Sequence, residues 1–281
     1  ARETSKPLLG RPSAAERAFV GNGRARRDMA GARAEQRAHV REVVVDGLRR
    51  NLRPLGDRGE RRVERALVGV QARRSGGDAL SSVPEIADWL ASLLDALAIP
   101  RAAFVGHSLG ALAVLDLAVR KPDGVSRIAL LGPSAPMPVA DVLLDAARRN
   151  DHLAFELITD WSFSAAHQLG GNEQPGVWMS GNALRLMERS RPGALFLDLI
   201  ACRDYSDGVN AAGGVRCPTL VILGQRDLMA PPANAKLLIE ALADKRVITL
   251  AGCGHSLMAE APQRVPPGGC QSGFSYNLNA Q

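Results

Sequence analysis

The stretch Gly106-His107-Ser108-Leu109-Gly110 lies between an apolar run, Ala102–Val105, and a longer apolar stretch, Leu109–Arg120. The run predicts a buried strand, and the longer stretch predicts a helix. At such a junction the pattern Gly-x-Ser-x-Gly is typical of a tight turn that pushes the serine hydroxyl clear of the backbone. The flanking glycines remove Cβ atoms that would clash, and the helix N-terminus favours negative charge at the site. Ser108 is therefore a candidate nucleophile.

The same alternation of strands and helices continues on both sides of this turn. Upstream, Ser82 is the predicted N-cap of a helix that has Pro84 in its first turn and Glu85 three residues after the cap. Downstream, we expect strands at Ile128–Leu131, Thr219–Leu223 and Val247–Leu250, and a helix at about Ala233–Ala243. Continuous apolar strands that alternate with helices predict an α/β fold, with a parallel sheet and helices on both of its faces.

Between the two halves of the predicted sheet, residues 136–205 read as helices that hold most of the bulky aromatic side chains. An aromatic-rich helical insert predicts a lid over a cleft, and additional core packing is the alternative. We assign to the substrate pocket three aromatic residues of this insert and one residue of the serine turn: Trp161, Phe163, Trp178 and His107.

A serine nucleophile requires a base, and the base requires a carboxylate that orients it. Among the five histidines, His255 follows the last predicted strand on a glycine-rich loop, which can bring its imidazole over the carboxyl edge of the sheet. Asp227 follows the strand before it in the same way. Three other acids follow no predicted strand: Asp204, Asp207 and Asp244. We therefore expect Asp227 to orient His255.

With these motifs the sequence resembles the α/β-hydrolase family, in its lid-bearing serine hydrolase branch. The resemblance covers about residues 73–264 and rests on the serine turn, on Leu223–Asp227, and on Gly252–His255 with Glu260 and Pro262 after it. It implies that the serine is the nucleophile, the histidine the general base and the aspartate its orienting group. It also implies the backbone N–H of Leu109 as one oxyanion donor, whereas the second donor remains unidentified.

The resemblance implies hydrolysis of a small or medium-sized apolar ester, or a related carbonyl compound, through an acyl-enzyme. It implies no metal and no organic cofactor, and a small molecule as the substrate. The family also includes carbon–carbon bond hydrolases of ring-cleavage products, which is the first alternative. A catalytically impaired, hydrolase-like protein is the second.

The first quarter of the chain departs from this pattern. Residues 1–74 hold 18 Arg and 1 Lys against 9 acids, a net charge of +10, whereas the rest of the chain carries −4. They contain no His-Gly pair for the second oxyanion donor, and Val43–Val45 is the only clear start of a strand. We hypothesise that residues 1–72, and the chain after Arg264, are translated out of frame. The alternative is a basic arm that binds nucleic acid or an acidic partner.

These observations predict four regions: a basic segment over residues 1–72, a core over 73–135 and 206–264, a lid over 136–205 and an irregular tail over 265–281. No apolar stretch is long enough to predict a membrane span or a secretion signal. The four cysteines lie far apart, which argues against a zinc site or a disulfide framework and fits the cytoplasm. Apart from the basic segment, nothing predicts nucleic acid as a partner.

Overall fold

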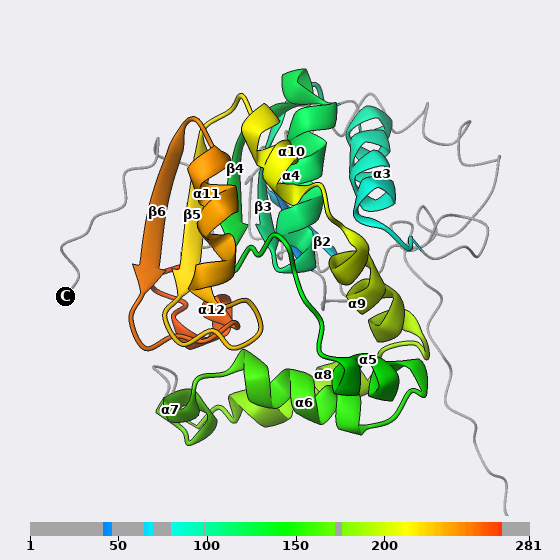
Figure 1. Cartoon of the computed structure of the whole chain (residues 1–281), viewed down its shortest axis with the longest axis vertical. Coiled ribbons are helices and arrows are strands. Elements are labelled where there is room, and N and C mark those ends of the chain that lie inside the picture. Colours follow the sequence, from blue (N-terminus) through cyan, green and yellow to red (C-terminus); the bar gives the residue numbers. More distant parts are fainter. Residues whose placement is uncertain (1–41, 47–64, 70–79, 98, 172–175, 266–281) are drawn as a thin grey trace, which may run out of the picture.

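The computed structural model describes residues 42–46, 65–69, 80–97, 99–171 and 176–265. Six parallel strands form one sheet in the order β2-β1-β3-β4-β5-β6 (Figure 1). The predicted parallel sheet is therefore confirmed. Its strands are β1 (Glu42–Asp46), β2 (Arg65–Gly69), β3 (Ala102–His107), β4 (Val125–Leu131), β5 (Thr219–Gly224) and β6 (Lys245–Leu250).

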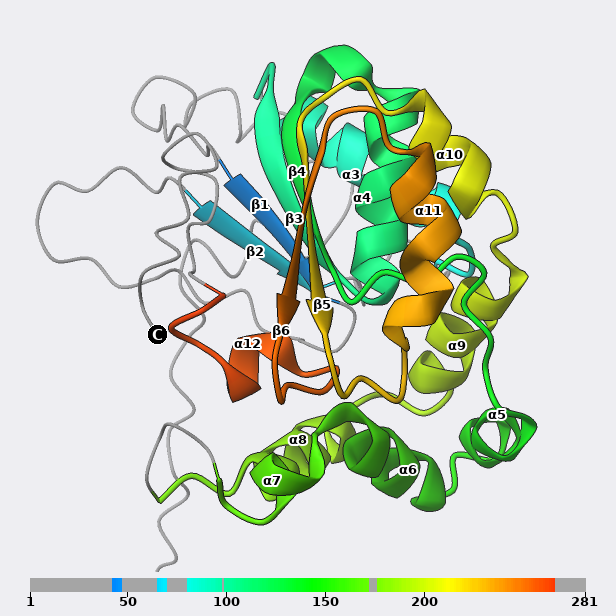
Figure 2. The ribbon, with the colours of Figure 1, turned by 60° about the vertical axis from the view of Figure 1, so that its left-hand side comes forward.

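Helices cover both faces of the sheet. Ser82 caps the first described helix as expected, because its side chain accepts a hydrogen bond from the Glu85 backbone N–H at 3.4 Å. Figure 2 shows the sheet edge-on with the larger group of helices on one side. That group is α3 (Val83–Ala96), α4 (Leu109–Arg120), α10 (Gly208–Gly214) and α11 (Lys236–Ala241), whereas α12 (Leu257–Glu260) packs on the other face. A short 3-10 helix at Pro122–Gly124 follows α4, and another at Pro232–Ala235 precedes α11.

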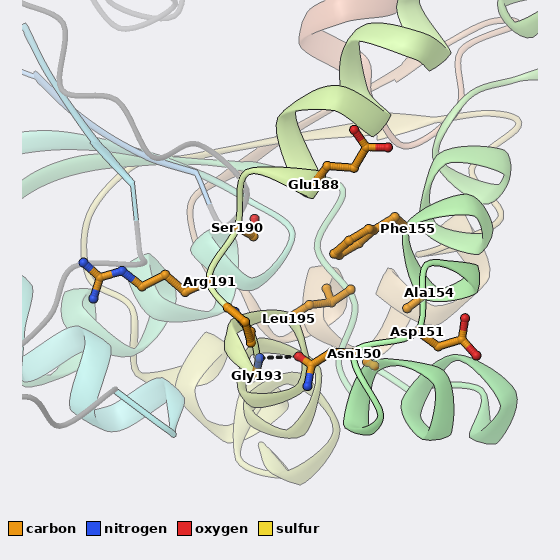
Figure 3. Close-up of a pocket in the computed structure, with 11 residues that line it drawn as sticks. Asn150, Asp151, Ala154, Phe155, Glu188, Ser190, Arg191, Gly193 and Leu195 are labelled. Carbon is orange, nitrogen blue, oxygen red and sulfur yellow. Dashed lines mark hydrogen bonds between the residues drawn. The ribbon is translucent and has the colours of Figure 1, made fainter. Parts of the chain in front are cut away.

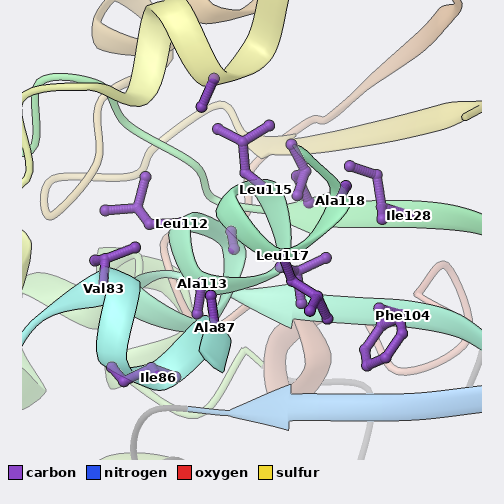
Figure 4. Packing of buried hydrophobic residues seen from close by; sticks show 14 of the residues in the cluster. Val83, Ile86, Ala87, Phe104, Leu112, Ala113, Leu115, Leu117, Ala118 and Ile128 are labelled. Carbon is purple, nitrogen blue, oxygen red and sulfur yellow. The ribbon is translucent and has the colours of Figure 1, made fainter. Parts of the chain in front are cut away.

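Successive side chains of the central strands point to opposite faces of the sheet and pack in two separate hydrophobic cores. In β3, Phe104 packs with α3 and α4, whereas its neighbour Ala103 packs on the opposite face with α12. Figure 4 shows Phe104 and Ile128 of the sheet beside the leucines of α4. Leu115 and Leu117 of α4 are completely buried, and burial of each such side chain contributes about 1.5–3 kcal/mol. This packing holds α4, and with it the serine turn, in a fixed position.

The helical insert lies between β4 and β5 and forms its own layer beyond the carboxyl ends of the strands (Figures 1 and 2). Much of its apolar surface packs in a separate cluster that includes Leu143, Ile158 and Leu199. At its end, the Tyr205 hydroxyl donates a hydrogen bond to the buried Asp116 of α4 at 3.0 Å. Its helices are α5 (Asp141–Arg148), α6 (Leu153–Ser162), α7 (Ala165–Gln168), α8 (Met179–Glu188) and α9 (Ala194–Asp204).

The basic first quarter contributes more strands than the sequence indicated. Val43–Val45 does form a strand, and it pairs with the serine strand so that Asp46 lies opposite His107. The second strand, at Arg65–Gly69, is not predicted by the sequence, because its three apolar residues directly follow Arg61, Arg62 and Arg65. The rest of the segment predicted at 1–72, and residues 266–281 of the predicted tail, lie outside the described residues.

Candidate active site

Ser108 occupies the turn between β3 and α4 with φ 55° and ψ −119°. Positive φ is uncommon for a residue with a side chain and marks a turn that the surroundings enforce. The Ser108 N–H donates to the Leu131 carbonyl at 3.0 Å, and a Cβ on Gly106 would lie 2.2 Å from the Gly110 carbonyl oxygen. Gly106 therefore makes the turn possible, and the serine side chain remains half-buried beside the helix N-terminus.

His255 and Asp227 form the pair that the sequence predicted. The His255 Nδ1 lies 2.7 Å from the Asp227 Oδ2, and both residues are 3% exposed. Because a carboxylate accepts hydrogen bonds, Nδ1–H donates and Nε2 is left as the acceptor, which is the form a general base needs. The other Asp227 oxygen, Oδ1, accepts the Ala230 N–H at 2.7 Å, so the carboxylate cannot turn away from the imidazole.

The end of β4 lies beside both the serine turn and the acid–base pair. Leu131 accepts the Ser108 N–H, and the next residue, Gly132, has φ +54°. A Cβ on Gly132 would lie 3.1 Å from the His255 Nδ1 and 3.4 Å from the Asp227 Oδ2. We did not single out Gly132 from the sequence, although a glycine directly after a predicted strand is a usable signal.

The loops after β5 and β6 are joined by backbone hydrogen bonds. Arg226 N–H donates to the Cys253 carbonyl at 2.7 Å, and Gln225 N–H donates to the Leu250 carbonyl at 3.0 Å. Gly224 lies so close to the second loop that an added Cβ would be 2.0 Å from the Gly254 carbonyl oxygen. The positions of Asp227 and His255 are therefore set by one connected piece of backbone.

We expect Gly224→Ala to displace the His255 loop, because the clash is with backbone atoms that cannot rotate away. Overpacking of this kind typically costs about 1–3 kcal/mol. Urea unfolding should show that loss in the free energy of unfolding. An activity assay should show a lower rate, because the histidine is displaced. The matched control is Gly213→Ala in α10, where an added Cβ meets no atom within 4 Å and stability should be equal or higher. Equal stabilities of the two variants would contradict the prediction.

The four residues assigned to the pocket lie in different surroundings. His107 is buried, and its Nε2 donates to the His255 carbonyl at 2.9 Å, so it supports the histidine loop. Phe163 is buried between Ser162, whose carbonyl accepts the His255 N–H, and Ser164, whose N–H donates to Glu260. In contrast, Trp161 packs in the cluster of the insert, and Trp178 is 69% exposed above Gly181. Their contact with a substrate stays a prediction.

Leu109 is the first residue of α4, so its N–H has no acceptor within the helix. Ser108 O accepts the N–H groups of Ala111 and Leu112 at 2.9 and 3.4 Å, which orients this helix end next to the serine. The arrangement suits Leu109 N–H as an oxyanion donor. The second oxyanion donor stays unidentified, and residues 47–64 and 70–79 lie outside the described part of the chain.

A cavity of about 160 Å³ lies within the insert (Figure 3). Phe155, Glu188 and Leu195 line it, and Asn150 accepts the Gly193 N–H at 2.5 Å along its wall. Neither the serine, the aspartate nor the histidine of the candidate site contributes to it.

Across residues 80–171 and 176–265, no cluster of three metal-ligating side chains forms. None of the described helices is both long and apolar enough to span a membrane.

Comparisons with known proteins show the family and the fold of the chain. A family model described as alpha/beta hydrolase fold matches residues 74–262. A pimeloyl-[acyl-carrier protein] methyl ester esterase from Aromatoleum aromaticum is 33% identical over 196 residues, covering 64% of this chain and 76% of that protein. A 2-hydroxy-6-oxo-6-phenylhexa-2,4-dienoate hydrolase from Comamonas testosteroni is 24% identical, covering 58% and 59%. The solved enol-lactonase of Burkholderia xenovorans has a TM-score of 0.66 at 21% identity, covering 82% and 89%.

Proposed function

The chain belongs to the α/β-hydrolase family, and from that premise we propose that it is a serine hydrolase that cleaves a small or medium-sized apolar ester. The observation that carries the proposal is the buried 2.7 Å contact between His255 and Asp227, next to a serine turn with positive φ. This combination supplies an oriented base and a half-buried serine at the carboxyl ends of the strands.

In the proposed reaction, His255 Nε2 takes the proton of the Ser108 hydroxyl while the oxygen attacks the ester carbonyl carbon. The Leu109 N–H stabilises the negative charge on the carbonyl oxygen of the tetrahedral intermediate. The intermediate collapses, and the departing alkoxide takes the proton from His255. Water then attacks the acyl-enzyme and loses its proton to His255. When the second tetrahedral intermediate collapses, the Ser108 oxygen leaves, takes that proton back from His255, and the acid is released. Asp227 keeps the imidazole in the required tautomer throughout.

We propose that the helical insert acts as the lid of this site. Its position beyond the carboxyl ends of the strands supports that role, as does Phe163, which is buried between two residues that contact the histidine loop. An apolar side chain at this place favours an apolar acyl group. The relative from Aromatoleum is named as a methyl ester esterase, which supports an ester as the substrate class.

A carbon–carbon bond hydrolase is the second candidate function, because a dienoate hydrolase is among the relatives. The same three residues would serve both reactions, so the site geometry does not separate them. Turnover of a vinylogous diketone, without turnover of simple esters, would favour this candidate. Neither reaction as proposed requires a metal or an organic cofactor, and we propose the cytoplasm as the compartment, in keeping with the isolated cysteines.

The proposal is tested by treating the purified chain with a fluorophosphonate and measuring the intact mass. We expect one covalent adduct per chain, located by peptide mapping at the serine turn, together with hydrolysis of short-chain nitrophenyl esters. A folded protein that forms no adduct would contradict the proposal and favour the impaired alternative. Adduct formation without ester turnover would favour the carbon–carbon candidate, and the vinylogous diketone would then be tried first.

A further inference from the structure

Glu260 is a completely buried carboxylate five residues after His255. A buried carboxylate is costly unless several donors surround it. The Gly254 N–H donates to Oε1 at 3.0 Å and to Oε2 at 2.9 Å, and the Ser164 N–H donates to Oε2 at 3.2 Å. The Nδ1 of His167 lies 2.8 Å from the same Oε2. Four contacts therefore surround a carboxylate that the proposed reaction does not use.

These contacts join two parts of the chain that are far apart in sequence. Gly254 directly precedes His255, whereas Ser164 and His167 belong to the insert, at the junction of α6 and α7. The carbonyl of Ser162 in the insert also accepts the N–H groups of His255 and Ser256, both at 2.9 Å. The backbone on both sides of the histidine is therefore bonded to the insert, directly or through the carboxylate of Glu260.

The packing beside this carboxylate is tight at Gly254 and at His167. A Cβ on Gly254 would lie 2.7 Å from the Ser164 nitrogen and 2.9 Å from the Glu260 Oε1. The side chain of His167 is 10% exposed, and its Nδ1 is also 2.6 Å from the Ser164 hydroxyl. A small displacement of the insert must therefore be transmitted to the histidine loop.

We propose that Glu260 is a positioning residue for His255, and that it holds the insert and the histidine loop as one unit through His167. The role of His255 in this inference rests on the proposed function. Glu260 would touch no substrate; it acts by fixing the backbone that carries the imidazole. A misplacement of about 1 Å can lower a reaction rate by about 10²-fold, which is the scale of the expected effect.

Glutamine is the sharpest replacement because it keeps the shape of the side chain. Since Gly254 N–H contacts both carboxylate oxygens, an amide NH₂ will face a donor there whichever way the glutamine is turned. We expect Glu260→Gln to slow fluorophosphonate labelling by about 10²-fold, and to lower kcat for an ester with little change in KM. The control is Glu240→Gln, an exposed carboxylate on α11 near Lys236, which should behave as the wild type.

A second readout does not depend on catalysis. The proton between His255 Nδ1 and Asp227 is buried and should give a resolved low-field NMR signal in the wild-type chain. We expect Glu260→Gln to broaden this signal or speed its exchange with water, and Glu240→Gln to leave it unchanged. If the wild-type chain forms no fluorophosphonate adduct, the proposed function fails, yet this signal still decides whether Glu260 positions the imidazole.

His167→Gln keeps the carboxylate and its two backbone donors, so it provides a milder variant should Glu260→Gln not fold. We expect a smaller loss of labelling rate, and faster amide exchange at both Ser164 and His255. In the double variant the two effects should be less than additive, because both residues act through one contact. Labelling rates and a His255 proton signal equal to those of the wild type in both single variants would overturn the proposal.

Discussion

Replacing Ser108 with alanine should abolish fluorophosphonate labelling and lower kcat for ester hydrolysis by about 10⁶-fold, as loss of a serine nucleophile does in other hydrolases. The expected effect is this large because no other described side chain at the turn offers an attacking oxygen next to the His255–Asp227 pair. The fold should remain, because alanine fits wherever serine does and the Ser108 N–H bond to Leu131 is made by the backbone.

Initial-rate assays would measure the loss of kcat, and intact-mass analysis would measure the loss of the adduct. Circular dichroism would show that the variant folds. Ser92→Ala is the matched control: Ser92 is exposed on α3, where its hydroxyl donates to the Asp88 carbonyl at 2.9 Å. It should label at the wild-type rate. If Ser108→Ala retained the adduct, another nucleophile would have to be found and the proposed mechanism would be wrong.

The second large effect is expected for Asp227→Asn, at about 10⁴-fold in kcat. The asparagine could present its NH₂ to His255 Nδ1, and the imidazole would then carry its proton on Nε2, where it cannot accept one from the serine. In the same orientation the asparagine oxygen takes the place of Oδ1, which accepts the Ala230 N–H at 2.7 Å, so the fold should tolerate the change.

The matched control is Asp244→Asn, because Asp244 is exposed and lies near the opposite end of the same pair of strands. We expect it to leave kcat and KM unchanged. A rate for Asp227→Asn within tenfold of the wild type would show that this carboxylate does not orient the base. Comparison of kcat with KM would separate the tautomer effect from weaker substrate binding, because only the former leaves KM largely intact.

The central elements could be predicted because their sequence patterns are dictated by burial on both sides. The helix expected at about Leu109–Arg120 has those bounds in the structure. The strand expected at Thr219–Leu223 is one residue longer and ends at Gly224. At the edge of the sheet the pattern is weaker. Strand β6 begins at Lys245 rather than Val247, because one side of an edge strand faces solvent and tolerates charged residues.

The sequence also predicted the residues of the candidate site, because the carboxyl ends of parallel strands meet at one edge. Ser108, Asp227 and His255 each follow a strand, and the structure places the last two in contact. It could not predict the supporting contacts. His167 and Glu260 are 93 positions apart, and nothing in the spacing of either residue indicates that they touch.

By itself, the sequence determined the α/β architecture, the serine turn and the order of the candidate catalytic residues. Those features follow from local rules: apolar periodicity, the geometry of tight turns and the direction of strands. Only the tertiary structure decided which buried groups hold the site together, including Gly132 against the imidazole and Glu260 between the insert and the histidine loop. These contacts depend on distances between segments that meet only when the chain is folded, and no local pattern encodes such distances.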